Sequence, residues 1–157
     1  MNLSASPKLR KQLAVEQEQL KHLLEVHRPL IEKCATISPD PIELSALAAM
    51  LHAFYSGIEN MFKRITVESD EAFPEGGAWH RQLVVSMTKG SFGRPAVISQ
   101  ELGEVLERYL EFRHVFRHAY PFQLSWLKMA ELVRGCEETF NRVEHEIEEF
   151  IEASERE

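Results

Sequence analysis

The chain has 157 residues, of which 44% are hydrophobic and 27% are charged. This balance is typical of a globular protein, and the length suits a single domain spanning residues 1–157. The formal net charge of −7 argues against generic nucleic-acid binding, which depends on neutralising phosphates. Most of the net negative charge lies after residue 120. Residues 121–157 carry ten acidic residues and four Lys/Arg, whereas residues 61–120 carry eight of each.

Four segments repeat apolar residues at alternating steps of three and four, which predicts amphipathic helices over about 7–37, 41–68, 100–119 and 126–154. A shorter helix is expected over 78–88, between two loops. Asp40, Ser99 and Ser125 precede three of these segments and are candidate N-caps. No useful stretch alternates with period two. We therefore expect an all-α antiparallel bundle of four long helices plus a short one.

Other classes of protein lack support. No apolar run approaches the ~18 residues of a membrane span, and residues 1–10 lack the apolar core of a signal peptide. Cys34 and Cys136 stand alone, without the spacing of a zinc site or a disulfide framework. No phosphate-binding Gly-rich motif and no Gly-x-Ser-x-Gly element is present. We expect a cytoplasmic protein with no membrane contact and no cofactor.

The most polar stretch is Arg113–Tyr120, which holds two arginines, two histidines and a tyrosine directly before Pro121. A metal site is one interpretation, because Glu111 and His114 form a Glu-x-x-His unit. Di-iron bundles need two such units, and no second one exists here. We therefore expect no metal.

Metal-free RNA cleavage is a second interpretation. RNA carries its own nucleophile, the 2′-hydroxyl, so a protein needs to supply proton transfer and a positive charge. Histidine can serve as acid or base near neutral pH, and arginine binds phosphate oxygens in a fork. On an ideal helix Arg113 and His118 lie about 140° apart, whereas Arg113, Arg117 and Tyr120 share a stripe. Convergence of Arg113 and His118 then needs a loosened helix end or a second subunit.

A structural interpretation stays open beside it. Basic residues at a helix end complement the helix dipole. Glu104, Glu107 and Glu111 are spaced to form ion pairs with them, and Tyr120 could be a packed aromatic residue.

The motif Arg113-x4-His118-x-Tyr120 resembles the signature of HEPN ribonucleases, specifically of the HepT-like toxins. Segments 54–65, 77–83 and 94–99 also resemble the second helix and the connecting segments of that group. The resemblance covers roughly residues 45 to 150.

The resemblance implies a homodimer that cuts RNA without metal at a cleft between subunits. Arg113 and His118 would be catalytic, with His114 and Arg117 as supporting residues at the RNA phosphate. It also implies a partner, a minimal nucleotidyltransferase antitoxin that silences the toxin by transferring AMP from ATP to Tyr120.

Lys63, Arg64 and His80 are secondary candidates, with Glu59, Asn60 and Trp79 beside them in the two similar segments. The alternative function is a non-catalytic helical scaffold that binds a nucleotidyltransferase.

Overall fold

The computed structural model describes residues 7–69, 71–91 and 93–156, and this part of the chain contains helices and loops but no strand. The elements in order are α1 (Pro7–Lys33), α2 (Pro41–Glu68), α3 (Trp79–Met87), α4 (Gln100–His118), the 3-10 helix η1 (Pro121–Gln123), α5 (Trp126–Arg134) and α6 (Cys136–Glu155). The predicted all-α fold is confirmed. Residues 1–6, on which the expectation about a signal peptide partly depends, lie outside the described residues.

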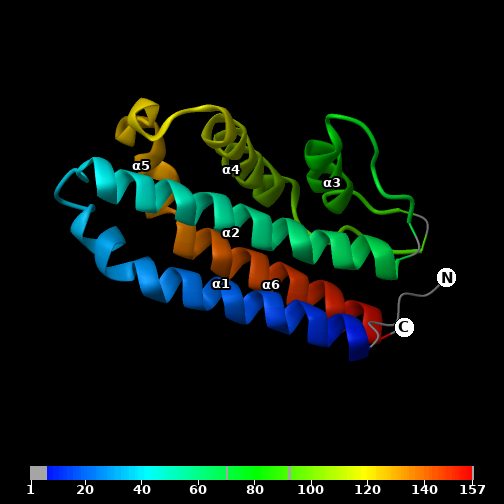
Figure 1. Ribbon diagram of the computed structural model, residues 1–157. Coiled ribbons are helices and arrows are strands. Elements are labelled where there is room, and N and C mark those ends of the chain that lie inside the picture. Colours follow the sequence, from blue (N-terminus) through cyan, green and yellow to red (C-terminus); the bar gives the residue numbers. More distant parts are fainter. Residues whose placement is uncertain (1–6, 70, 92, 157) are drawn as a thin grey trace.

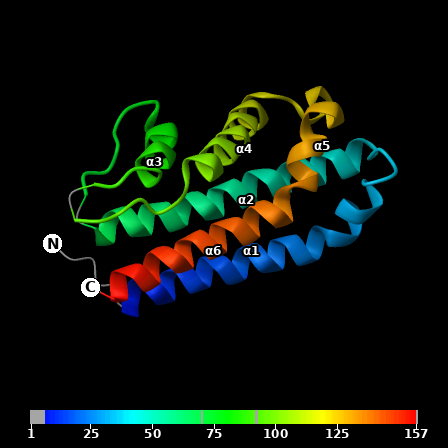
Figure 2. The ribbon, with the colours of Figure 1, turned by 180° about the vertical axis from the view of Figure 1, so that it is seen from behind.

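The long helices α1, α2 and α6 run side by side, with α1 antiparallel to the other two (Figure 1). Helices α3, α4 and α5 lie along the opposite side of α2, which therefore sits between two groups of helices. The view from behind shows the same arrangement (Figure 2). No helix within the described residues has the length and apolarity that crossing a membrane requires.

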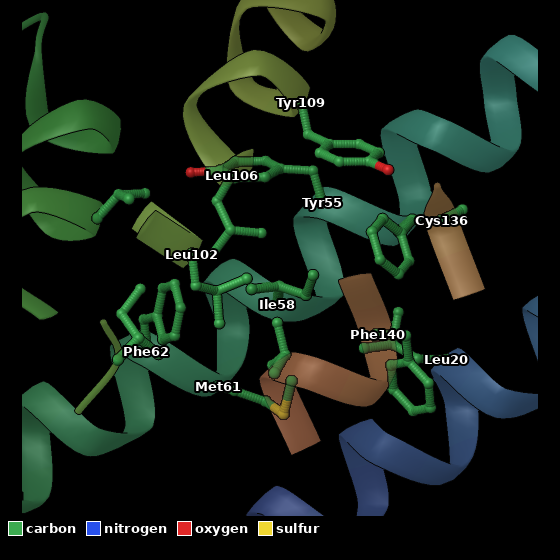
Figure 3. Packing of buried hydrophobic residues seen from close by; sticks show 14 of the residues in the cluster. Leu20, Tyr55, Ile58, Met61, Phe62, Leu102, Leu106, Tyr109, Cys136 and Phe140 are labelled. Atoms are coloured by element: carbon green, nitrogen blue, oxygen red, sulfur yellow. The ribbon is translucent and has the colours of Figure 1, made fainter. Parts of the chain in front are cut away.

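Helix α2 is central because it is apolar on more than one face. Thirteen of its 28 residues are buried, more than in any other helix. Figure 3 shows Tyr55 and Ile58 of α2 facing Leu102 and Leu106 of α4, with Phe140 of α6 nearby. Helix α1 approaches closely on the other side, where a Cβ on Gly57 would meet Leu20 Cδ2 at 2.6 Å.

All three predicted N-cap residues occupy N-cap positions, and two of them make a capping hydrogen bond. The Asp40 carboxylate accepts from the Glu43 backbone N–H at 2.8 Å, and Glu43 bonds back to the Asp40 N–H at 3.0 Å, which forms a capping box. Ser99 Oγ accepts from the Leu102 N–H at 3.1 Å. Ser125 occupies the N-cap position of α5 with extended backbone geometry, but its side chain makes no capping hydrogen bond.

The prediction of one helix over residues 126–154 is wrong, because the chain breaks at Gly135 into α5 and α6. In a continuous helix the Leu132 carbonyl would accept from the N–H four residues later. Instead the buried Tyr109 hydroxyl of α4 donates to Leu132 O at 2.7 Å. The bundle therefore has four long helices and two short ones within the described residues, and α4 is tied to the α5–α6 corner.

Candidate functional site

A cleft of about 570 Å³ opens between the C-terminal half of α4 and the segment that leads into α3. Its size lies within the range of small-molecule sites. Residues of α4 that line it include Arg113, His114, Arg117 and His118, while His80 lines the α3 side. The structure thus brings four of the residues singled out around the motif into one cleft, together with one of the secondary candidates.

Arg113 and His118 reach this cleft without any loosening of the helix. Helix α4 continues to His118, and Ala119 is the first residue with extended geometry (φ −112°, ψ 144°). At about 100° per residue, Arg117 and His114 fall between Arg113 and His118 on the helix surface. The four side chains therefore form one broad arc that faces the cleft, with Arg113 and His118 at its two edges.

Neither arginine of the motif forms an ion pair within the described residues, although the structural interpretation needs such pairs. Glu111 lies 3.7 Å from Arg81 of α3 instead. Arg113 is half-buried, and its Nε is buried without a hydrogen-bond partner. Arg117 and His118 do lie in the last turn of α4, where the dipole favours positive charge. The structure nevertheless leaves two guanidinium groups available to an anion.

The positive charge of the two arginines reaches α2. Burial is the main cause that lowers the pKa of His52, and Arg113 and Arg117 lower it further. The His52 ring packs on Phe116 with 5.3 Å between centroids. The packing of His52 indicates a structural role, while the direction of its pKa shift includes a contribution from the charge of both arginines.

The two histidines of the motif are exposed and lie edge to face, with ring centroids 4.8 Å apart. Glu111 also lines the cleft, yet no group of three His, Cys, Asp or Glu side chains gathers into a possible metal site in the described part of the chain.

The secondary candidates divide into two groups. His80 lines the cleft and its Nδ1 lies 2.7 Å from Oε2 of the buried Glu59. Lys63 lies 3.8 Å from the other Glu59 oxygen and 4.8 Å above the Trp79 ring. Arg64 is exposed on α2 and does not line the cleft. Glu59 and His80 lie 21 residues apart in the sequence. The spacing of residues along the chain could not predict their contact.

Tyr120 departs from its predicted position. The expectation that it continues the stripe of Arg113 and Arg117 is wrong, because α4 ends at His118 and the residue before a proline avoids helical geometry. Tyr120 is extended (φ −71°, ψ 150°), 68% exposed, and stacked on Phe122 with 5.4 Å between centroids. It lies just beyond the helix end that carries His118.

Comparison with known protein families gives one match: residues 46–154 fit the family described as HepT-like protein. Comparison with curated proteins and with solved structures gives no match. The matched residues run from the second turn of α2 almost to the end of α6, and so include the cleft and the whole motif. The all-helical fold agrees with this match, and the chain belongs to the HepT-like proteins, which are of the HEPN type.

Proposed function

We propose that this protein is an endoribonuclease that needs no metal and acts as the toxin of a toxin–antitoxin pair. Membership of the HepT-like family points to a HEPN-type toxin. The observation that carries the proposal is the pair of guanidinium groups in the cleft, Arg113 and Arg117, without carboxylate partners among the described residues. Histidines beside them supply the proton-transfer groups that RNA cleavage requires.

The proposed reaction is attack of the RNA 2′-oxygen on the adjacent phosphorus. Arg113 and Arg117 bind the phosphate oxygens and stabilise the charge that develops on them, and His118 transfers a proton. Preorganised charge and general acid–base catalysis each contribute roughly 10²–10⁴-fold in rate. His114 supports the site by packing on His118.

A homodimer is part of the proposal, because a second copy would add another set of these residues and concentrate positive charge in an acidic protein. Exposed apolar side chains support an interface near the cleft. Val115, Phe122 and Leu127 are 53%, 81% and 90% exposed, and they lie in the last part of α4, in η1 and in α5.

The proposed partner is a minimal nucleotidyltransferase antitoxin that transfers AMP to Tyr120. The chain has three tyrosines, of which Tyr55 and Tyr109 are 0% and 2% exposed, whereas Tyr120 is 68% exposed. Only Tyr120 offers its hydroxyl to another enzyme. A phosphate group attached there would place negative charge and bulk two residues from His118, against the approach of RNA.

The test is cleavage of RNA by the purified protein in the presence of EDTA. Arg113→Ala and His118→Ala should each abolish most cleavage. Arg108 and His145 are matched controls, because both are exposed, pair with glutamates at 3.5 Å and 3.1 Å, and lie outside the cleft. Arg108→Ala and His145→Ala should cleave at the wild-type rate. Binding of a nucleotidyltransferase without any RNA cleavage would instead support the scaffold alternative.

A further inference from the structure

A buried carboxylate lies beside the cleft. Glu59 of α2 is 3% exposed, and burying a charged carboxylate is costly unless a partner compensates for its lost hydration. The nearest partner is His80, whose Nδ1 lies 2.7 Å from Glu59 Oε2. The distance of 3.8 Å from Lys63 Nζ to the other oxygen is longer than a hydrogen bond. The main contact of this buried acid is therefore the histidine.

The His80 ring also makes an aromatic contact. Its ring stacks on Trp79 with 3.6 Å between centroids, and Trp79 in turn packs against Phe73 at 5.4 Å. The His80 side chain nevertheless keeps 19% of its surface exposed and lines the cleft. The ring is thus oriented by a carboxylate and by a stacked indole, and it is still accessible from the cleft.

The carboxylate also selects the tautomer. Glu59 accepts a hydrogen bond, so His80 Nδ1 carries the proton and Nε2 is the ring nitrogen left for a ligand. A carboxylate in this position also stabilises the positive ring that forms when Nε2 takes up a second proton. His118, by comparison, is exposed and contacts the His114 ring. The cleft therefore holds histidines of two kinds: His80, which is oriented by a buried acid, and His114 and His118, which lie on the exposed helix end.

We propose that His80 is a second catalytic residue of the RNA cleavage proposed above, on which this inference rests, and that Glu59 positions it. His80 Nε2 takes the proton from the 2′-hydroxyl as the bond from O2′ to phosphorus forms. The bond from phosphorus to O5′ breaks, and protonated His118 gives its proton to O5′. The products are a 2′,3′-cyclic phosphate and a 5′-hydroxyl, and exchange of protons with water restores both histidines. Base and acid then come from opposite walls of one cleft.

The test compares His80→Ala and His118→Ala on two versions of one RNA oligonucleotide. The first has an ordinary 5′-oxygen at the cut, and the second has sulfur there, a leaving group that departs without help from an acid. On the first, both variants should lose about 10²–10⁴-fold in kcat. On the second, the defect of His118→Ala should largely disappear, and that of His80→Ala should persist. Added imidazole should partly restore His80→Ala, which it would not do for a residue with only a structural role.

Glu59→Gln keeps the size of the side chain and removes its charge. It should lower kcat by about tenfold or more and change KM little, because Glu59 acts through His80 and does not touch RNA. His145→Gln removes a histidine that also pairs with a glutamate, but on the exposed face of α6, and should leave both constants unchanged. Circular dichroism and thermal unfolding check that each variant is folded.

The outcomes separate the two proposals. If the wild-type protein does not cleave RNA, the proposed function fails and this inference fails with it. If the wild type cleaves, His118→Ala does not, and folded His80→Ala cleaves like the wild type, only the inference is overturned. A His80→Ala defect that disappears on the sulfur substrate would also overturn the assignment of His80 as the base.

Discussion

Replacing Arg113 by methionine separates a catalytic role from a structural one. Methionine keeps an unbranched side chain that can pack where the arginine stem packs, but it has no charge and no N–H group. Arg113 Nε is buried without a hydrogen-bond partner, and an unsatisfied buried donor costs about 1–3 kcal/mol. The free energy of unfolding should therefore stay the same or rise by up to that amount. For a chain of this size, each 1 kcal/mol corresponds to about 2–4 °C in Tm.

The rate of RNA cleavage should change in the opposite sense. Arg113 is proposed to stabilise charge on the phosphate oxygens in the transition state. Removing one preorganised donor of this kind costs about 10²–10³ in rate. The assay is single-turnover cleavage of a fluorescent RNA oligonucleotide, alongside urea denaturation of the same samples.

Arg94→Met is the matched control. The Arg94 side chain is 1% exposed and forms two hydrogen bonds with Glu71, at 2.6 Å and 3.0 Å. Breaking such a buried pair from one side costs about 3–5 kcal/mol, so Arg94→Met should unfold far more easily. If Arg113→Met loses more than about 2 kcal/mol of stability and cleaves RNA at the wild-type rate, Arg113 is a structural residue and not a catalytic one.

Three further predictions concern charge and modification. Burial alone raises the pKa of Glu71, but its polar neighbours, chiefly the Arg94 guanidinium that donates two hydrogen bonds to it, outweigh burial and lower the pKa overall. The pair therefore stabilises the fold above about pH 4.3, the usual glutamate value, and this stabilisation is lost as pH falls through the lowered pKa. Urea denaturation should show a steeper loss below that pH for the wild type than for Glu71→Gln, and equal slopes would contradict the assignment. Arg113→Met combined with Arg117→Met should raise the pKa of His52, measured by NMR titration; an unchanged pKa would show that the arginines do not act on α2. Incubation with a cognate nucleotidyltransferase and ATP should add the mass of AMP to the wild type and not to Tyr120→Phe, whereas AMP on the variant would place the modification elsewhere.

The sequence predicted the helices well where the residue pattern that determines them is local. The three/four spacing of apolar residues depends on one helix at a time, and the capping box at Asp40 lies within four residues. The break at Gly135 has a distant cause, because the Tyr109 hydroxyl that takes up the Leu132 carbonyl comes from α4. A continuous apolar stripe over residues 126–154 carries no trace of that bond.

In the candidate site, too, local sequence spacing predicted some features, and others depend on how distant segments pack. Helical geometry correctly separates Arg113 from His118 by about 140°. It could not show that both side chains line one cleft, whose other wall is the segment that leads into α3. The sequence spacing allowed ion pairs between nearby glutamates and the arginines of the motif. Only the structure shows that Glu111 pairs with Arg81 instead. The contact between Glu59 and His80 depends on how α3 packs on α2, which no pattern within either segment encodes.

The most direct test of metal-free cleavage by the RNA 2′-oxygen is a substitution in the RNA. An oligonucleotide that the wild-type protein cuts in EDTA at one mapped position is made again with a single 2′-deoxy nucleotide on the 5′ side of that position. If the 2′-oxygen is the nucleophile, cutting at that position should stop, and the unmodified RNA should yield a 2′,3′-cyclic phosphate. Continued cutting at the deoxy position would contradict attack by the 2′-oxygen, and with it the role proposed for the cleft.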